Sequence, residues 1–464
     1  MTKTKRYHGL FLGIWVALAC MTATAYAFEE APVGAVDRKS YSIGSSDEAY
    51  VKRFGESAFE GVEEAISPQV EQNREPGAVQ IEKAFAFSTE YDSNVFLRRN
   101  DPKDDVSFIY TPSVGIVRGR KGETKSYLQT FYNLTYVDHV EYQKLSRFNH
   151  QILSKIGWRT DKLRVDISND ARPYSAKSAA DRTELHSSTT AQVIDHSDTF
   201  RLSVAYDVTP KITLSHAYGY AIDYFAASSN ENNRGVEHSS EQVHSFNPRI
   251  SYAWTAKTTL YTDYQFKMSD FFRGGQFASK TQTFNFGLNH VFSLKTALNT
   301  QAGWAFNDFN EDGIRSGNGF VYRAAVIHKF SEKLSGTLYT AKSLGKSYEA
   351  AGATIFTESL NVDIYSGGVA LGWAVTPSMN LKTGFKALFT HRDGYITLTD
   401  TENPSLSFTR EHEDEIYAWN VDWSWVPKGS WAYYLRYELY NHNASFKNFE
   451  YTAYSLLGSL QYTF

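Results

Sequence analysis

The chain has 464 residues, of which 15% are aromatic and 21% are charged, and it contains one cysteine. Its net charge of −4 at pH 7 argues against nucleic acid as a partner, because proteins that bind phosphate backbones usually carry excess Lys and Arg. Mean hydropathy is −0.42, and beyond the N-terminal segment no apolar run reaches the roughly 20 residues of a membrane helix. A chain rich in aromatic residues yet hydrophilic on average is typical of transmembrane β-barrels, in which only alternate strand residues meet lipid.

The first 27 residues have the three parts of a secretory signal peptide. These are a basic stretch over residues 3–6, an apolar stretch over Leu10–Ala19, and the A-x-A pattern Ala25–Ala27. We expect cleavage before Phe28, which removes three of the 47 basic residues and leaves 44 against 51 acidic ones, a net charge of −7. The alternative is lipidation at Cys20, but position 17 is Ala, where lipoprotein signals usually have a larger aliphatic residue.

Residues 28–80 differ from the rest of the chain. They are acidic and poor in aromatic residues, and an amphipathic helix is predicted over Ser46–Ile66, before Ser67-Pro68. We interpret them as a periplasmic extension. The alternative is a plug inside the barrel, since larger barrels are often occluded.

From residue 81 to Phe464 apolar and polar residues alternate. Clear examples are Phe200–Val208, Phe284–Phe292 and Trp431–Leu439. Successive side chains of a strand point to opposite faces, and a tilted strand crosses a bilayer in about 9–11 residues. The pattern predicts an all-β, antiparallel, up-and-down transmembrane barrel over residues 81–464; a secreted soluble β-protein is the alternative.

A turn signal recurs between the strands: an aromatic residue, a short polar turn and, in most cases, a lysine. The instances are Trp158–Lys162, Tyr206–Lys211, Trp254–Lys257, Phe292–Lys295, Phe330–Lys333, Trp373–Pro377 and Trp425–Lys428. A less typical eighth turn spans Arg118–Lys125, and longer polar segments such as Tyr174–Ser197, Ala226–Glu241 and Asp393–Glu411 lie between the turns. Short periplasmic turns and long extracellular loops are typical of outer-membrane barrels.

Eight turns join sixteen strands. One further strand at each end, near Lys83–Leu97 and Tyr451–Phe464, gives a preferred count of eighteen within a range of sixteen to eighteen, with both termini periplasmic. Tyr462 and Phe464 close the final strand and resemble the signal read by the outer-membrane barrel assembly machinery. We therefore expect a protein of the outer membrane of a Gram-negative bacterium, with outer-membrane lipid and that machinery as partners.

If the apolar residues face lipid, the opposite parity faces the lumen. The charged residues that we predict to line the pore are Arg164, Asp166, Arg201, Asp207, Arg249, Asp263, Lys267, Arg323, Lys329, Lys382, Lys386, Asp422, Arg436 and Glu438. A barrel of this size is wide enough for an aqueous channel. Any single charge can instead brace the wall, and the mixed signs suggest little ion selectivity. Tyr261 and Tyr434 share the polar parity and could contact sugars.

Aromatic residues that precede the turns are predicted to form an interfacial girdle. They are Trp158, Tyr206, Trp254, Phe292, Phe330, Trp373 and Trp425.

No motif indicates an enzyme or a cofactor. His186–Ser188 and His238–Ser240 have no recognisable third partner, and Glu411–Glu415 lacks the second His of a zinc helix. We therefore predict no catalytic residue, no cofactor and no metal. A solvated acidic loop is the simpler interpretation of the residues that could hold Ca²⁺, which are Asp92, Asn94, Asp104 and Asp105.

Two segments near the start of the barrel, Glu90–Phe96 and Asp104–Gly115, resemble the opening of the β-barrel porin 2 family. In that family a strand ends in D-x-N-[VI]-[FY], and an acidic loop and a strand with Pro and Gly follow. Members often accompany exopolysaccharide or capsule synthesis genes, so the resemblance implies a barrel that exports polysaccharide, with periplasmic polysaccharide-export proteins as partners. The family has no agreed catalytic residues, and the acidic segment before residue 81 is not a feature associated with it.

The leading hypothesis is therefore an outer-membrane pore that exports exopolysaccharide. The first alternative is a general or sugar-uptake porin, with Tyr174–Ser197 as the loop that would narrow the channel. The second is a surface enzyme or adhesin on a barrel scaffold.

Overall fold

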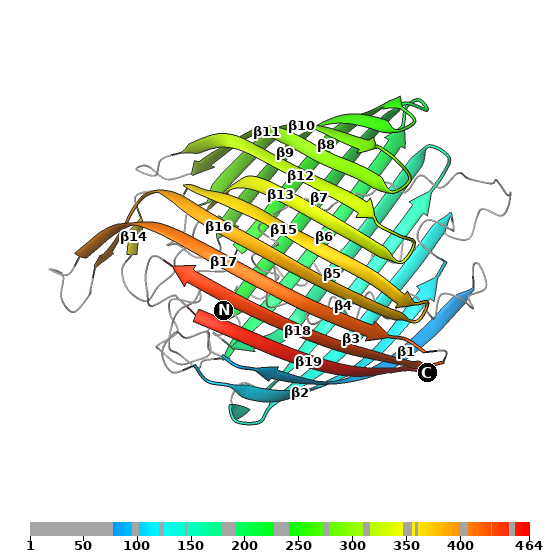
Figure 1. Ribbon diagram of the computed structural model, residues 1–464, viewed down its shortest axis with the longest axis vertical. Coiled ribbons are helices and arrows are strands. Elements are labelled where there is room, and N and C mark those ends of the chain that lie inside the picture. Colours follow the sequence, from blue (N-terminus) through cyan, green and yellow to red (C-terminus); the bar gives the residue numbers. More distant parts are fainter. Residues whose placement is uncertain are drawn as a thin grey trace, which may run out of the picture. The chain divides into compact units, whose positions relative to one another are not determined.

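The computed structural model describes residues 78–94, 102–119, 125–143, 146–178, 192–226, 241–271, 278–309, 316–346, 355–357, 361–399, 407–427, 429–444 and 451–464 (Figure 1). All of them belong to one compact unit, Asp47–Phe464. No helix among these residues could span a membrane. The predictions for the signal peptide, Cys20, and the helix over residues 46–66 of the extension lie outside the described residues.

The described chain is built of antiparallel strands. They are β1 (Val79–Asp92), β2 (Asp105–Arg118), β3 (Ser126–His139), β4 (Arg147–Arg159), β5 (Leu163–Ser178), β6 (Gln192–Asp207), β7 (Ile212–Ala226), β8 (Glu241–Thr255), β9 (Thr258–Phe271), β10 (Ser279–Val291), β11 (Thr296–Phe309), β12 (Gly317–Lys329), β13 (Leu334–Lys346), β14 (Ile355–Thr357), β15 (Asn361–Thr376), β16 (Met379–Thr399), β17 (Ser407–Trp425), β18 (Trp431–Ala444) and β19 (Tyr451–Thr463).

Eighteen of these strands form a closed barrel. Each pairs with its neighbours along the chain, except that β13 pairs with β15 and the three-residue β14 pairs only with β16. The sheet closes where β1 and β19 lie side by side, with Ala84 opposite Thr463 and Asp92 opposite Ser455 (Figure 1). The predicted antiparallel barrel of eighteen strands is confirmed.

The two ends of the barrel differ as the turn signal predicts. Val79 at the start of β1 pairs with Arg118 at the end of β2, and the end of β19 pairs with β1 nearby. The described ends of the barrel chain therefore lie on the same side as the tight turns, which we call the turn end. The opposite side is the loop end.

Strand lengths at the loop end depart from the prediction. The segment Ala226–Glu241 does separate β7 from β8, but Tyr174–Ser197 and Asp393–Glu411 were predicted as loops and are partly strand. Pairing there continues to Ser178 with Gln192 and to Thr399 with Ser407. The reason is that interstrand hydrogen bonds join backbone groups and do not require apolar side chains. The strands can therefore extend beyond the segments in which apolar and polar residues alternate.

The tight turns share one hydrogen-bonding scheme, which explains their recurring Ser and Thr. The hydroxyls of Thr209, Ser293 and Ser331 each accept a hydrogen bond from the backbone N–H three residues later, at 3.0–3.1 Å. The N–H groups of Ile212 and Thr296 also lie 3.3 Å from the carbonyls of Thr209 and Ser293, so in these turns the hydroxyl supplements the backbone bond. The turn before β18 uses another solution, because Gly429 has a φ of 126°, which favours glycine.

Backbone bonds also link each turn to the next around the barrel. The carbonyl of Lys211 accepts from the N–H of Ala253 at 2.8 Å, and that of Lys257 accepts from Val291 at 2.8 Å. Equivalent bonds run from Lys125 to Arg159 at one side and from Lys83 to Phe464 at the closing pair. The turn end is therefore fixed by the backbone around its circumference.

Candidate functional site: the inner wall of the barrel

The register places all fourteen predicted pore-lining residues on one face of the sheet. Directly paired residues share a face, so the face can be followed from Arg249 to Asp263 on β9 and on to Asn285 on β10. Further around the barrel, the same face carries Lys382, Asp422 and Arg436, because Lys382 pairs with Asp422 and Asp422 pairs with Arg436. The parity prediction is therefore consistent around the whole closed sheet.

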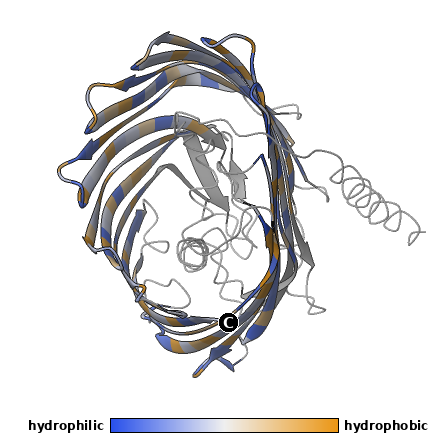
Figure 2. Ribbon diagram, turned by 90° about the vertical axis from the view of Figure 1, so that its right-hand side faces the viewer, coloured by the Kyte–Doolittle hydropathy of each residue, from blue (hydrophilic) through white to orange (hydrophobic). Residues whose placement is uncertain are grey.

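This polar face is also the less exposed one. Asp263 on it is 3% exposed, whereas Phe286 on the opposite face is 61% exposed. Side chains converge on the concave side of a closed sheet and spread apart on the convex side, so we assign the polar face to the interior. Hydrophilic and hydrophobic residues alternate along the strands in Figure 2. That these residues contact a solute stays a prediction.

The wall is not polar everywhere. Ile109, Val137 and Leu457 have the inward parity, yet they form a buried apolar cluster across β2, β3 and β19. Alternation alone did not predict this cluster, because its members come from strands that meet only when the barrel closes.

The seven predicted girdle residues all lie on the surface beside the tight turns, with exposed fractions from 37% for Trp425 to 62% for Trp254. Two of them have matching surroundings. The His290 ring meets Phe292 edge-on at 4.5 Å and its Nδ1 bonds Thr258, while His328 contacts Phe330 at 4.7 Å and bonds Thr296. The exposed Trp and Tyr rings of this set have a polar edge, which suits the headgroup depth of a bilayer.

The predicted assembly signal lies beside the closing pair of strands. Tyr462 packs on Trp431 at 4.7 Å between ring centroids and edge-on against Phe464 at 4.8 Å. The N–H of Phe464 donates to the carbonyl of Lys83 on β1 at 3.0 Å. Recognition of these residues by an assembly machinery stays a prediction.

Asp263 shows how charges brace the wall. Its fully buried carboxylate accepts from Arg249 at 3.0 Å, from Asn285 at 3.0 Å and from Gln265 at 3.2 Å. The Arg249 guanidinium also lies 4.3 Å from the centre of the Tyr261 ring. A buried charge with this many donors is a structural element of β8–β10.

Other predicted pore residues are braced in the same way. Arg164 forms an ion pair with Asp207 at 3.0 Å, and Tyr127 donates to Asp166 at 2.7 Å. Arg436 bonds Asp422 and lies 3.9 Å from Glu438. The bracing alternative therefore describes Arg164, Asp166, Asp207, Arg249, Asp263, Asp422, Arg436 and Glu438.

Inner aromatic rings lie against glycines of the neighbouring strand. A Cβ added to Gly157 would clash with the Tyr127 ring, and one added to Gly287 would clash with Tyr261. Tyr261 is only 4% exposed and donates to Gln301 at 3.2 Å. It is therefore not available to stack on a sugar, contrary to the sequence-based suggestion, and the Tyr434 hydroxyl is likewise inaccessible to solvent. The signal that sequence reasoning missed is a glycine directly opposite an aromatic residue.

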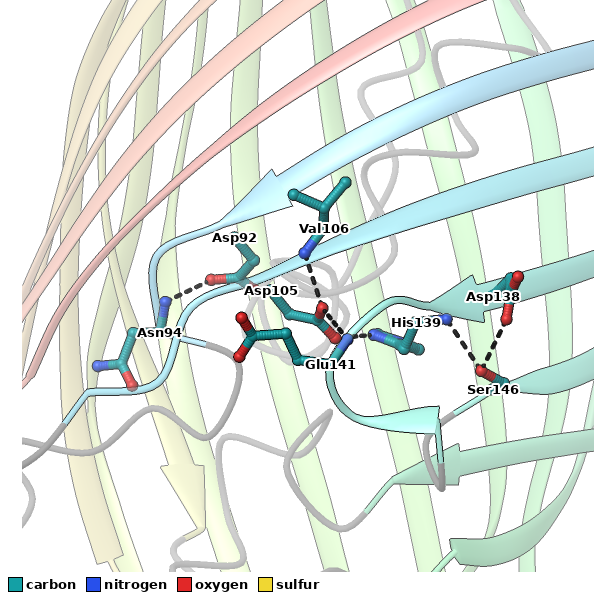
Figure 3. Close-up of polar contacts among 8 residues, drawn as sticks. All are labelled: Asp92, Asn94, Asp105, Val106, Asp138, His139, Glu141 and Ser146. Atoms are coloured by element: carbon teal, nitrogen blue, oxygen red, sulfur yellow. Dashed lines mark hydrogen bonds and ion pairs between the residues drawn. The ribbon is translucent and has the colours of Figure 1, made fainter.

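At the loop end, Asp105 organises the chain next to β2 and β3 (Figure 3). Its carboxylate bonds His139 Nδ1 at 2.8 Å and accepts the N–H groups of Val106 and Glu141 at 2.8 and 3.0 Å. Asp92 in turn accepts the N–H of Asn94 at 2.8 Å. The acidic residues considered for Ca²⁺ are thus engaged with protein groups, and no cluster with metal-ligand composition occurs in the described ranges.

The candidate enzyme motifs contribute no site to the described structure. His186–Ser188 and His238–Ser240 lie outside the described residues, and Glu411–Glu415 falls within strand β17.

No family model and no curated protein matches the chain. Solved structures of similar fold include the FrpB iron transporter of Neisseria meningitidis in its apoprotein form, with a TM-score of 0.47 and 9% identity over 84% of this chain and 82% of that one. The outer membrane protein OpdK of Pseudomonas aeruginosa has a TM-score of 0.41 and 9% identity over 83% and 99%. OccAB3 of Acinetobacter baumannii has a TM-score of 0.43 and 10% identity over 83% and 99%. The resemblance to the β-barrel porin 2 family stays a hypothesis.

Proposed function

We propose that the chain is an outer-membrane pore that passes exopolysaccharide from the periplasm to the cell surface. The observation that carries the proposal is the closed sheet of eighteen strands with a polar inner face and exposed apolar residues outside. Barrels of this strand number enclose more space than inward side chains alone fill, so a water-lined passage is expected.

The outer membrane is the compartment that fits this surface best. Large apolar side chains such as Phe284, Leu338 and Phe286 are more than half exposed, which is costly in water and favourable in hydrocarbon. The exposed aromatic residues at the turn end suit a membrane interface. The N-terminal segment resembles a signal peptide, which would direct the chain across the inner membrane.

Export of a polymer, rather than uptake, is supported by the resemblance to the porin 2 family. The residues that carry it occupy the place where the barrel closes: Asn94 is buried, and its side-chain amide donates to the carbonyl of Thr452 next to β19 at 3.3 Å. In this chain the motif therefore orders the loop end of β1. The motif thus has a structural role, and the residues proposed to line the passage are those of the inner wall.

Deletion of the gene tests the proposal. We expect surface polysaccharide to disappear while polymer or its precursors accumulate inside the cell, and plasmid-borne wild-type protein to restore the surface polymer. Normal surface polymer in the deletion strain would contradict export.

Liposome swelling distinguishes the uptake alternative. A sugar-uptake porin should admit small sugars quickly when reconstituted, and its deletion should slow growth on one carbon source without changing surface polymer. Rapid swelling together with normal surface polymer would favour uptake over export.

A further inference from the structure

Two adjoining hollows lie in the wall near the turn end. Their volumes are about 260 and 210 Å³, and both are lined by Ser335, Gly372 and Lys382 on β13, β15 and β16. One extends towards the turn before β13, and the other towards Asp422 on β17. We call this combined feature the turn-end hollow.

The hollow exists because small residues stand between lysines in one row of the wall. The register orders that row as Lys329, Ser335, Gly372, Lys382, Asp422 and Arg436. A Cβ added to Gly372 would have only the Ser335 hydroxyl within 4 Å, at 3.6 Å. Gly372 is therefore not covered by a neighbouring ring, unlike Gly157 and Gly287.

The lining is basic. Lys329, Lys333 and Lys382 are exposed side chains, and the acidic lining residues are Glu332 and Asp422. The Asp422 charge is already matched, because its carboxylate bonds Arg436 and accepts from Asn420 at 2.6 Å. Three lysines against two acidic residues leave the lining with an excess of positive charge.

The surrounding wall has the same sign. On the inner face of β10–β16, where side chains are described, the charged residues are Arg323, Lys329, Lys382 and Lys386, and none is acidic. We call this region the basic arc. The inner face of β1–β3 is the acidic arc, which carries Glu82, Glu90, Asp92 and Asp105 and no Lys or Arg among its described side chains.

We propose that the turn-end hollow binds anionic groups of the transported solute: carboxylate, sulfate or phosphate. Lysine suits this task because its compact charge on a flexible stem accepts several anion geometries. The proposal rests on the pore function and sharpens it: with the turn end as the periplasmic mouth, the hollow would select an acidic polymer for export.

The test is calorimetric titration of the detergent-purified full chain with trigalacturonate, with maltotriose as the neutral control. Wild-type protein should bind trigalacturonate and not maltotriose. The double variant Lys329→Gln/Lys382→Gln should weaken binding by about five- to tenfold, which corresponds to two partly exposed charge contacts.

The matched control is Lys155→Gln/Lys267→Gln, which removes two inner-wall lysines of β4 and β9 that do not line the hollow. It should bind within about twofold of wild type, which is the size of a weak, screened charge effect. Equal loss in both variants, or no binding by folded wild type, would overturn the proposal; heat-modifiable migration in gels reports folding.

Conductance of the same samples in planar bilayers separates the two proposals. If the wild-type barrel conducts ions but does not bind trigalacturonate, the pore proposal stands and the anion-site proposal is wrong. If the barrel binds trigalacturonate but never conducts ions, the anion-site proposal stands and the pore proposal is wrong.

Discussion

The acidic and basic arcs both lie on the inward-facing parity of the sheet, but their charged side chains differ in burial and in hydrogen bonding. In the acidic arc, Asp105 and Glu82 are buried, and Asp105 holds the backbone of the neighbouring chain at the loop end. In the basic arc, Lys329 and Lys382 stay exposed beside a glycine that no ring covers. Parity thus indicates which face a charge occupies, whereas burial and the number of donors decide whether it braces the wall or meets solvent.

The largest expected effect comes from removing a bracing charge. Asp263→Ala leaves Arg249 and Asn285 without their common acceptor, and we expect the free energy of unfolding to fall by about 3 kcal/mol. Lys382→Ala in the basic arc should change it by less than about 0.5 kcal/mol. Urea unfolding in detergent micelles, followed by tryptophan fluorescence, measures both. Equal losses of unfolding free energy in the two variants would show that Asp263 does not stabilise the wall more than Lys382 does.

A smaller effect should distinguish covered from uncovered glycines. Gly157→Ala forces the Tyr127 ring away from its place against the wall and from Asp166, so we expect a loss of about 2 kcal/mol in the same unfolding experiment. Gly372→Ala meets no such ring and should be within about 0.5 kcal/mol of wild type. If both variants were equally unstable, the space above Gly372 would not be open.

The smallest effect concerns ion selectivity. Lys329→Glu/Lys382→Glu reverses the sign of the turn-end hollow, so the cation-to-anion permeability ratio should rise by about twofold, as read from the reversal potential in a KCl gradient. The same reversal at Lys155 and Lys267 should shift the ratio less, because neither lysine lines the hollow. A larger shift from the second pair would contradict the proposed importance of the hollow.

The sequence predicts the barrel because its two signals are local. Alternation over segments such as Phe284–Phe292 reports the two faces, and the turn signal at Phe292–Lys295 reports a hydroxyl that accepts from Thr296. Neither signal needs a distant partner. The count of eighteen strands and the side of the tight turns follow from these two patterns alone.

What the sequence could not show depends on partners brought together by pairing. His139 bonds Asp105 from 34 positions away, and Leu457 joins Ile109 only when β19 meets β1 and β2. The cover of Tyr261 over Gly287 likewise requires the register of β9 with β10. The alternating pattern therefore predicts which face of the sheet a residue occupies. It does not identify the neighbours that decide whether a charge braces the wall.

The bonds that join one turn to the next have a consequence for the aperture at that mouth. Each such bond, for example between Lys257 and Val291, ties two hairpins without any side chain that a ligand could displace. The opening is then a rigid ring whose width is set by the number of strands. If a long polymer uses this mouth, as proposed above, we expect it to enter end first, one repeating unit behind another.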